Sequence, residues 1–286
     1  MRPSSRLKAM IADGKTHIAP GAYDGLSARI IQNAGAELLY ATGGGIARST
    51  GVPDMGLISV KEVTDRLQQM VDAVDIPVIA DMDTGYGNAL NARRAVRAFE
   101  RAGVAGFHIE DQVFPKRCGH LEGKAVVGEA EFCAKLRAVR DSLDDDDTVV
   151  IARTDAIAVE GLDAALDRMH RYIEAGADVA FVEAPRDESQ IERIARELPC
   201  PKLLNMFWGG KTPILARDRL EALGFNLVIV PGDLQRGAIR VMQELAAIIL
   251  RDGHTESAKH LMASFEDREA AVDTAHYMEL DGRYGH

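Results

Sequence analysis

Residues 77–111 read "PVIADMDTGYGNALNARRAVRAFERAGVAGFHIED". An apolar run opens this segment, an amphipathic stretch follows at 90–103, and a second apolar run, "GFHIED", begins at residue 106. The amphipathic stretch ends in Ala102-Gly103, and glycine readily takes the left-handed conformation with which many helices end before a strand. The segment therefore predicts a strand, a helix and a second strand.

The same unit recurs along the whole chain. In "SVKEVTDRLQQMVDAV", residues 59–74, apolar side chains fall at steps of three and four, which is the spacing of one face of a helix. Repeated strand-helix units without a linker rich in Pro, Gly or Ser predict a single (β/α)8 TIM barrel over residues 1–286, with 250–286 as a C-terminal helical extension. The apolar runs begin at residues 17, 37, 77, 106, 148, 179, 202 and 226.

An open, doubly wound sheet is the main alternative architecture. Its nucleotide-binding turn would have to be "TGGGIARSTG" at 42–51, which follows an apolar run. The glycines of this stretch do not have the G-x-G-x-x-G spacing, and no helix is expected to begin there. The sequence therefore favours the barrel over the open sheet.

Composition restricts the kinds of partner. The 286 residues are 47% hydrophobic, enough for a large core, and the formal net charge of −10 argues against nucleic acid as a partner. No stretch approaches the roughly 18 apolar residues of a membrane span, and the first residues lack the apolar core of a signal peptide. Three scattered cysteines argue against a disulfide framework. We expect a cytoplasmic protein that acts on a small molecule, without a membrane or nucleic-acid partner.

One acidic run, Asp144 to Asp147, has two interpretations. It is either a calcium site or a solvated turn. The run lacks the spacing of an EF-hand loop, and it precedes the apolar run at 148, so a turn is the expectation.

Polar residues stand where the predicted strands end. In a (β/α)8 barrel the catalytic groups come from the carboxyl ends of several strands. Each acid alone would more commonly cap a helix, but residues from six strand ends that converge on one face favour an active site. These residues are Thr42, Gly43, Gly44, Asp81, Asp83, Glu110, Arg153, Asp155, Glu183 and Asn205.

The carboxylates among them indicate a hard cation. Asp81, Asp83 and Glu110 suit Mg²⁺, with Mn²⁺ as the alternative ion, because Mg²⁺ takes few protein carboxylates and leaves positions for substrate oxygens. A 2-oxo or 2-hydroxy acid would chelate such an ion, which would stabilise negative charge on the C2 oxygen. Arg153 would neutralise a substrate carboxylate or the same oxygen. His108, between apolar residues of "GFHIED", is either a core histidine or a partner of the site.

The stretch "FPKRCGHLEGK", residues 114–124, predicts a mobile lid with a reactive thiol. A lone cysteine is usually a small buried hydrophobe, and Cys133 and Cys200 fit that description. Around Cys118 the neighbours are polar, and Lys116, Arg117 and His120 are expected to lower its pKa toward neutrality, where a general acid or base works best. We count Lys116 and His120 with Cys118 among the catalytic candidates. Gly119 and Gly123 would let the segment close over the site.

Five motifs support a resemblance to a known family. "DMDTGYGN", "HIEDQ", "KRCGH", "ARTDA" and "FVEA" occur in that order, and together they resemble the isocitrate lyase/phosphoenolpyruvate mutase superfamily, from about residue 20 to past residue 240. "KRCGH" is typical of the carbon–carbon lyases of this group, most like 2-methylisocitrate lyase and 2,3-dimethylmalate lyase. The carboxyphosphonoenolpyruvate mutase branch also carries it.

The resemblance implies a Mg²⁺-dependent barrel, commonly a homotetramer, whose last helix is swapped between subunits. The implied reaction cleaves a 2-hydroxy acid between C2 and C3, yields a 2-oxo acid such as pyruvate, and has the lid cysteine protonate the second product. By resemblance, Asp81 and Asp83 would bind Mg²⁺, Glu110 and Asp54 would hold its water shell, and Thr42, Gly43 and Gly44 would bind the oxo-acid carboxylate. Arg153 would contact the C2 oxygen, and Cys118 would donate the proton beside the backbone of Gly119. Glu183 and Asn205 would form a pocket wall, and Arg236 and Arg268 would bind the distal carboxylates.

Two departures from the family pattern affect the distal half of the substrate. Trp208, in "NMFWGG", stands where relatives usually have a glutamate, and this is either a local packing change or a change of substrate. Asp233, in "PGD", stands where relatives usually have Ser or Thr, and it would repel a substrate carboxylate unless Arg236 neutralises it. The exact substrate therefore stays open.

Three alternatives remain beside the lyase. Two of them use the same enolate-stabilising site: decarboxylation or hydrolysis of oxaloacetate, and mutase chemistry on a carboxyphosphonoenolpyruvate-type substrate. The third is a non-catalytic binding protein on a retained barrel. The third is disfavoured because a site that had lost its activity would have no reason to keep all five of Asp81, Asp83, Glu110, Cys118 and Arg153.

Overall fold

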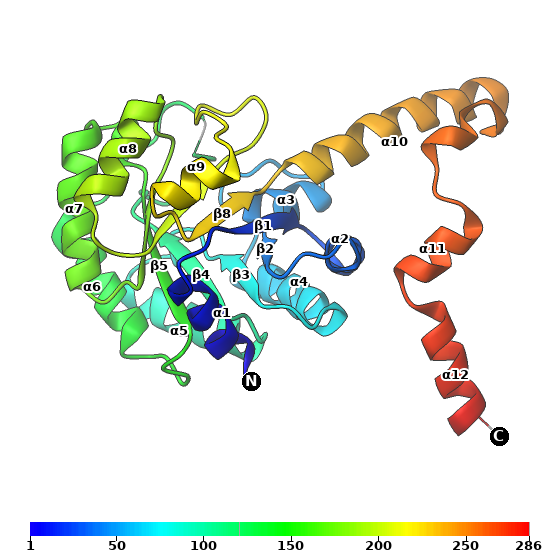
Figure 1. Ribbon diagram of the computed structural model, residues 1–286, viewed down its shortest axis with the longest axis horizontal. Helices are drawn as coiled ribbons and strands as arrows, with labels where there is room; N and C mark the ends of the chain where they lie inside the picture. The colour runs from blue at the N-terminus through cyan, green and yellow to red at the C-terminus, as the bar shows by residue number, and fades with distance from the viewer. Residues whose placement is uncertain (120, 286) are drawn as a thin grey trace.

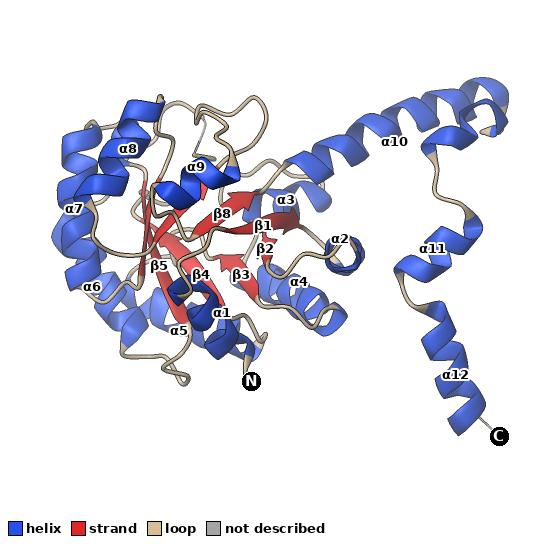
Figure 2. Cartoon of the chain, viewed as in Figure 1, coloured by secondary structure: helices blue, strands red, loops and turns tan. Residues whose placement is uncertain are grey.

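The computed structural model describes residues 1–119 and 121–285. Its strands form a closed, all-parallel barrel in chain order, in which β8 pairs back to β1 (Figures 1 and 2). The predicted (β/α)8 fold is confirmed, and each apolar run provides one strand. The strands are β1 (His17–Ala22), β2 (Leu39–Ala41), β3 (Val78–Asp81), β4 (Gly106–Glu110), β5 (Val149–Thr154), β6 (Val179–Val182), β7 (Lys202–Asn205) and β8 (Leu227–Val230).

Helices surround the barrel, and α1 lies across its lower end, which is the end at which the strands begin (Figure 2). The amphipathic helices turn their apolar stripe to the strands; in α4, for example, Val63, Leu67 and Met70 are the buried residues. The helices are α1 (Pro3–Ala12), α2 (Gly25–Asn33), α3 (Gly43–Ser49), α4 (Val60–Ala73), α5 (Ala89–Arg101), α6 (Glu129–Arg140), the short η1 (Ala156–Ala158), α7 (Leu162–Glu174), α8 (Glu188–Glu197), α9 (Arg217–Ala222), α10 (Asp233–Asp252), the short η2 (Glu256–Leu261), α11 (Phe265–Ala271) and α12 (Thr274–Tyr284).

The barrel interior is filled by side chains. Leu7 of α1 reaches the interior from below and is fully buried, and at Gly106 the walls are so close that a Cβ would lie 2.8 Å from the Val149 carbonyl oxygen. Higher up, Tyr40 and His108 form the next layer, and the His108 ring meets Phe181 edge-on at 5.5 Å. This packed column is the floor on which any site at the carboxyl ends of the strands must rest.

The acidic turn at 144–147 is not simply solvated. The Ser4 hydroxyl donates to Asp145 at 2.7 Å, and the Ser5 hydroxyl donates to Asp147 at 2.6 Å. Asp144 and Asp146 are exposed, as expected. The turn therefore holds α1 against the lower end of the barrel, and the prediction of a surface turn is correct but incomplete.

The glycine-rich stretch after β2 does begin a helix, so the expectation that no helix starts there is wrong. Thr42 caps α3, and its hydroxyl oxygen accepts a hydrogen bond from the Gly45 N–H at 3.4 Å. A Cβ at Gly43 would lie 2.6 Å from an Asp81 carboxylate oxygen. Glycine is a poor helix former, but here it is required because the first turn of α3 presses directly on β3.

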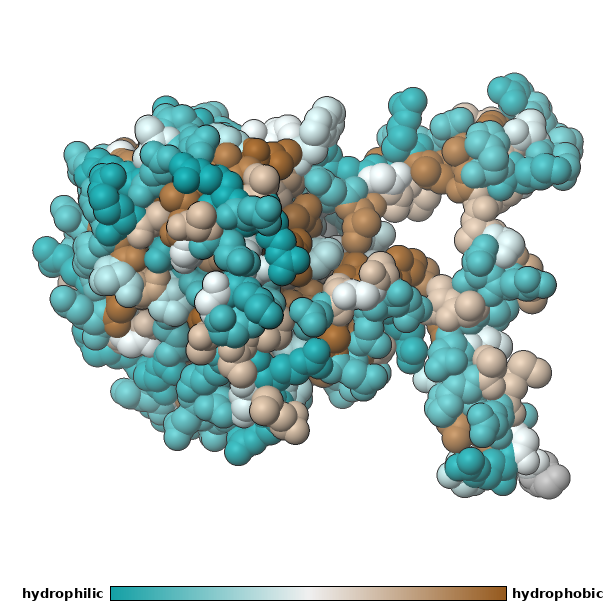
Figure 3. All heavy atoms as spheres, in the orientation of Figure 1, coloured by the Kyte–Doolittle hydropathy of each residue, from teal (hydrophilic) through white to brown (hydrophobic). Residues whose placement is uncertain are grey.

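The chain leaves the barrel along α10. Figure 1 shows α10, α11 and α12 projecting away from the barrel as an arm. Exposed apolar side chains are spread along the arm, among them Leu250 (88% exposed), Phe265 and Met278 (both 70%). Figure 3 shows hydrophobic surface both along α10 and on the flank of the barrel that faces the arm. Among the described residues, no helix has both the length and the apolar character needed to span a membrane.

Candidate active site

A cavity of about 340 Å³ opens at the carboxyl end of the barrel. Most of the residues predicted for the site line it, although they come from many different strands and loops. The predicted residues in its wall are Thr42, Gly44, Asp54, Asp81, Lys116, Cys118, Gly119, Arg153, Glu183, Asn205 and Arg236.

Three other predicted residues lie just below the cavity. Gly43 supports Asp81 from the start of α3, while Asp83 and Glu110 are buried at the ends of β3 and β4. His120 falls outside the described residues. Arg268 lies on α11 in the arm, where its guanidinium stacks on Phe265 at 4.5 Å, so it does not reach the cavity of its own subunit.

The Lys116 side chain places a positive charge between two of the predicted site carboxylates, Asp54 and Asp83. The Lys116 ammonium lies 2.7 Å from Asp83 Oδ1 and also contacts Asp54. Both carboxylate oxygens of Glu110 are buried and accept no hydrogen bond from the described residues. One of them, Oε2, forms an ion pair with Arg153 Nε at 3.2 Å. No three His, Cys, Asp or Glu residues within the described ranges converge into a complete metal-ligand set. The donor set therefore fits an ion that takes one or two carboxylates and completes its shell with water and substrate, as Mg²⁺ does.

Asp81 is held in its charged form. Burial opposes the charged carboxylate, but His108, Lys116 and Arg153 outweigh it and lower the pKa of Asp81 to about 2. Burial also lowers the pKa of His108 to about 4, so that this ring is neutral at neutral pH. Lys116 and Arg153 are therefore the charges that keep Asp81 ionised under those conditions.

His108 is a partner of the site as well as part of the core. Its Nε2 lies 2.8 Å from the Tyr40 hydroxyl, which itself donates to Asp81 at 3.3 Å. Since Tyr40 lines the cavity and His108 does not, the histidine acts on the site by orienting the tyrosine. The two interpretations left open by the sequence are both partly correct.

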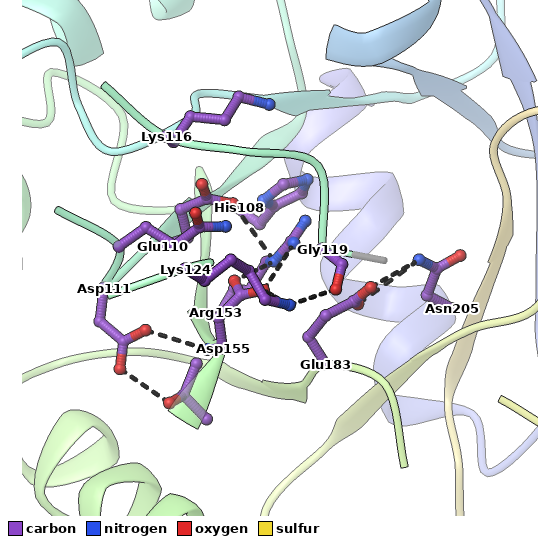
Figure 4. Close-up of polar contacts among 12 residues, drawn as sticks. His108, Glu110, Asp111, Lys116, Gly119, Lys124, Arg153, Asp155, Glu183 and Asn205 are labelled. Atoms are coloured by element: carbon purple, nitrogen blue, oxygen red, sulfur yellow. Dashed lines mark hydrogen bonds and ion pairs between the residues drawn. The ribbon is translucent and has the colours of Figure 1, made fainter. Parts of the chain in front are cut away.

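Arg153 is at the centre of a buried ion cluster (Figure 4). Its Nε donates to Asp155 at 2.9 Å and its Nη2 donates to the other oxygen of the same carboxylate at 3.2 Å. The guanidinium also lies over the Phe181 ring at 5.2 Å. This two-point grip fixes the plane of the guanidinium, which then faces the cavity in one orientation.

Glu183 and Asn205 form the part of the cavity wall next to Arg153. The Asn205 amide donates to both oxygens of Glu183, at 3.2 and 3.4 Å (Figure 4). Gly119 from the lid approaches this wall so closely that a Cβ there would lie 2.5 Å from both Glu183 Oε1 and Arg153 Nη2. Only glycine therefore allows the lid to lie against these two side chains.

The predicted lid is a loop anchored at its base. Gln112 donates to the Arg117 carbonyl at 2.9 Å and accepts from the Arg117 N–H at 3.0 Å. Cys118 is half-buried and lines the cavity. The Lys116 ammonium forms ion pairs with the carboxylates of Asp54 and Asp83. The Arg117 guanidinium donates to the Glu122 carbonyl at 3.2 Å. Both cations therefore have partners other than the thiol, while their expected effect on the pKa of Cys118 stays a prediction.

The two departures from the family pattern meet at Arg236. Its guanidinium stacks on the Trp208 ring at 4.9 Å, donates to the Trp208 carbonyl and lies 3.8 Å from Asp233. Asp233 is therefore partly neutralised by Arg236, which is the condition under which it would not repel a substrate. The same contacts leave Arg236 less positive charge for a substrate carboxylate.

Several lining residues were not found from the sequence. Arg48 stands in the last turn of α3, and because that helix was not predicted, the direction of this side chain toward the cavity could not be predicted either. The cavity wall also contains apolar side chains. They are Phe207, Ile229, Pro231 and Ile239.

Comparison with known proteins agrees with the site. The sequence model of the phosphoenolpyruvate phosphomutase family matches residues 7–250. The chain is 38% identical over 285 residues to 2,3-dimethylmalate lyase of Eubacterium barkeri, covering 99% of both chains. It is 38% identical over 262 residues to 2-methylisocitrate lyase of Bacillus subtilis (strain 168), covering 92% of this chain and 85% of the relative.

Among solved structures, oxaloacetate acetylhydrolase in complex with the inhibitor 3,3-difluorooxalacetate superimposes with a TM-score of 0.93. It is 32% identical in sequence, and the match covers 99% of this chain and 97% of that one. The fold is therefore shared by proteins named for different reactions, so the chemistry has to be argued from this chain's own residues.

Proposed function

This chain belongs to the phosphoenolpyruvate phosphomutase family, and on that premise we propose that it is a Mg²⁺-dependent carbon–carbon lyase. Its substrate is a 2-hydroxy acid of the alkylmalate or 2-methylisocitrate type, cleaved to a 2-oxo acid such as pyruvate and a second carboxylate. The observation that carries the proposal is the position of Cys118, which lines the same cavity as Asp81 and Arg153. A thiol proton donor next to a site for stabilising an anion is what C–C cleavage requires and simple binding does not.

Binding places the oxo-acid half of the substrate at the base of the cavity. The start of α3, with Thr42 and Gly44 in the wall, presents backbone N–H groups to the C1 carboxylate. The Arg153 guanidinium faces the C2 oxygen. Mg²⁺, held by Asp81 and Asp83 with Glu110 and Asp54 around its water shell, would stabilise negative charge on that oxygen when bound.

Cleavage then moves one proton at each end of the broken bond. A site carboxylate accepts the proton of the 2-hydroxyl, the C2–C3 bond breaks, and its electron pair passes to C3 and the adjacent carboxylate. The Cys118 thiol donates its proton to C3 and becomes a thiolate. Solvent returns a proton to the thiolate and takes one from the carboxylate, so both groups are restored. The closed lid keeps water away from the carbanion until the thiol has reacted.

Within this class we propose that dicarboxylic alkylmalates are favoured over tricarboxylic acids. The cavity wall contains the apolar side chains of Phe207, Ile229 and Ile239, and Arg236 shares its charge with Asp233. A substrate methyl group therefore fits this wall better than a third carboxylate does. Release of the 2-oxo acid (pyruvate, or glyoxylate from isocitrate), followed with lactate dehydrogenase, should show a higher kcat/KM for 2,3-dimethylmalate than for 2-methylisocitrate and isocitrate. Equal or reversed preference would contradict this part of the proposal.

Hydrolysis of oxaloacetate is the second candidate, because oxaloacetate acetylhydrolase shares the fold at 32% identity. That reaction adds water to C2 and yields oxalate and acetate, and the acetate carbanion released at C3 also needs a proton, which the Cys118 thiol would supply. The two reactions therefore differ in the attack of water at C2 and not in the proton donor. Oxalate formed from oxaloacetate by the wild-type protein, without oxo-acid release from any 2-hydroxy acid, would favour it.

The Asp81→Asn variant tests the metal site without relying on activity. Loss of one charged ligand should weaken Mn²⁺ binding about tenfold or more, since the ion is bound mainly by charged oxygen ligands. Electron paramagnetic resonance of free Mn²⁺ measures this directly. Asp65→Asn, on the exposed face of α4, is the matched control and should bind like wild type. Unchanged Mn²⁺ binding in Asp81→Asn would rule out Asp81 as a ligand.

A homotetramer with exchanged C-terminal helices is part of the proposal. The arm carries exposed apolar side chains, and an apolar groove of about 580 Å³ lies beside β1, β8 and α2, with Ile30, Ile31 and Leu234 in its wall. A second copy is the occupant that we propose for such a groove. Deleting residues 253–286 should therefore lower the molar mass found by size-exclusion chromatography with light scattering. Assembly unchanged by the deletion would show that the arm is not needed.

We propose the cytoplasm as the compartment, because the mechanism needs Cys118 as a thiol. Cytoplasmic glutathione and thioredoxin keep thiols reduced, whereas an oxidising compartment would favour modification of an accessible cysteine.

A further inference from the structure

Lys124 makes a buried bridge between the lid and the barrel. Its ammonium donates to the Gly119 carbonyl and lies 3.0 Å from Asp155 Oδ1 (Figure 4). The Lys124 side chain is 2% exposed and that of Asp155 is fully buried. Removing a charged ammonium from water is costly, and it is tolerated where a carboxylate and a carbonyl both accept from it. Because Lys124 and Gly119 both belong to the lid and Asp155 belongs to the barrel, the ammonium is fully satisfied only when the lid lies against the barrel in this position.

The barrel side of the bridge is rigid. The Asp155 N–H donates to Asp111 at 3.0 Å, and Asp111 in turn accepts from the hydroxyls of Thr154 at 2.7 Å and Tyr172 at 2.9 Å. The carboxylate of Asp155 is also gripped by two nitrogens of Arg153. Asp155 therefore connects a fixed buried network to two cations, one in the active site and one in the lid.

The lid side of the bridge fixes the position of the proposed catalytic thiol, Cys118. Gly119 follows Cys118 directly, and its Cα lies so close to Arg153 and Glu183 that no side chain would fit. A carbonyl held at Gly119 therefore fixes the backbone that carries Cys118 over the cavity. Lys124 does not line the cavity, so we expect it to act through Gly119 and Asp155.

We propose that Lys124 is a positioning residue: it ties the closed lid to the Arg153–Asp155 pair and so places Cys118 against the reacting carbon. The inference rests on the proposed function for its kinetic consequence only. The alternative is that Lys124 merely stabilises the loop, with no influence on where the thiol stands.

The test compares Lys124→Met with Lys202→Met. Lys202 is a matched control because it is also buried and also donates to backbone carbonyls, those of Leu198 and Cys200, but at the opposite end of the barrel. The measurement is the rate of alkylation by iodoacetamide at each cysteine, followed by peptide mass spectrometry. We expect Cys118 to react about tenfold faster in Lys124→Met, the size expected for loss of a hydrogen bond to a charged group, because the lid opens more often. Cys133 is the internal reference in both variants and should not change. Cys200 serves as a reference only in Lys124→Met, because Lys202 bonds to its carbonyl.

Kinetics provide the second readout. Lys124→Met should lower kcat about tenfold or more with KM changed less than about threefold, since a displaced proton donor affects the reaction step more than binding. Lys124→Arg keeps the charge and should recover part of the loss. Should methionine unfold the protein, Lys124→Gln carries the same test with a neutral donor of similar length.

The outcomes separate this inference from the proposed function. Equal Cys118 alkylation in wild type and Lys124→Met would overturn the positioning role even if the lyase activity is confirmed. A wild type without lyase activity, but with faster alkylation in Lys124→Met, would overturn the proposed function and leave the link between lid and barrel standing.

Discussion

Cys118→Ala is expected to lower kcat for the 2-hydroxy acid by a factor on the order of 10³, within the range that a positioned general acid contributes. Of the two predicted lid groups that line the cavity, the Lys116 ammonium is paired with Asp54 and Asp83, so Cys118 is the proton donor that we propose, and alanine has no proton to give. KM should change little, because the carboxylate and C2 oxygen are bound by other groups. Steady-state rates of pyruvate release measure both quantities.

Two matched variants are available in the same chain. Cys133 lies on α6 and Cys200 precedes β7, and neither lines the cavity. Cys133→Ala and Cys200→Ala should keep kcat within about twofold of wild type, as expected for groups that do not touch the reacting atoms. Full activity in Cys118→Ala would show that another group, or water, protonates the product.

Arg153→Met is expected to lower the free energy of unfolding by about 3–5 kcal/mol and to abolish activity. The guanidinium lies between Glu110 and Asp155, whose side chains are at most 1% exposed. Methionine leaves both carboxylates buried without their main cation. The cost is therefore that of an uncompensated buried charge rather than of one lost contact.

Urea unfolding at one fixed protein concentration measures this change, since an oligomer's stability depends on concentration. Arg193→Met is the control, because its ion pairs with Asp163 and Glu197 are on the surface and should contribute less than about 1 kcal/mol. Arg153→Lys keeps the charge but not the two-point grip, so it should recover stability more than activity. Equal stability of Arg153→Met and wild type would contradict a structural role for the ion cluster.

The strands and most of the site could be predicted from the sequence for a physical reason. Parallel strands of a barrel are buried on both faces, so they form short, nearly continuous apolar runs, and the first polar residue after each run marks the carboxyl end. Asp81, Glu110, Arg153 and Glu183 were found in this way, and the structure brings all four together. Their convergence follows from the barrel's topology and not from their spacing in the chain.

What could not be predicted depends on side-chain direction and on tight packing. The helix at Gly43 was missed because its glycines contradict helix propensity and are required by contact with Asp81. Lys116 and Lys124 flank the same thiol, but Lys116 pairs with Asp54 and Asp83, whereas Lys124 pairs with Asp155. No sequence pattern distinguishes these two directions. The contacts of Arg236 with Trp208 and Asp233 likewise join residues far apart in sequence.

Cleavage of 2,3-dimethylmalate in D₂O with Mg²⁺, followed by proton nuclear magnetic resonance, tests the central claim most directly. The account predicts equal amounts of pyruvate and of propionate with one deuterium at C2, because the exchanged Cys118 thiol delivers a single deuteron to the carbon released from the broken bond. Unconverted dimethylmalate, together with oxalate and acetate formed from oxaloacetate under the same conditions, would contradict a C–C lyase and identify the protein as a hydrolase.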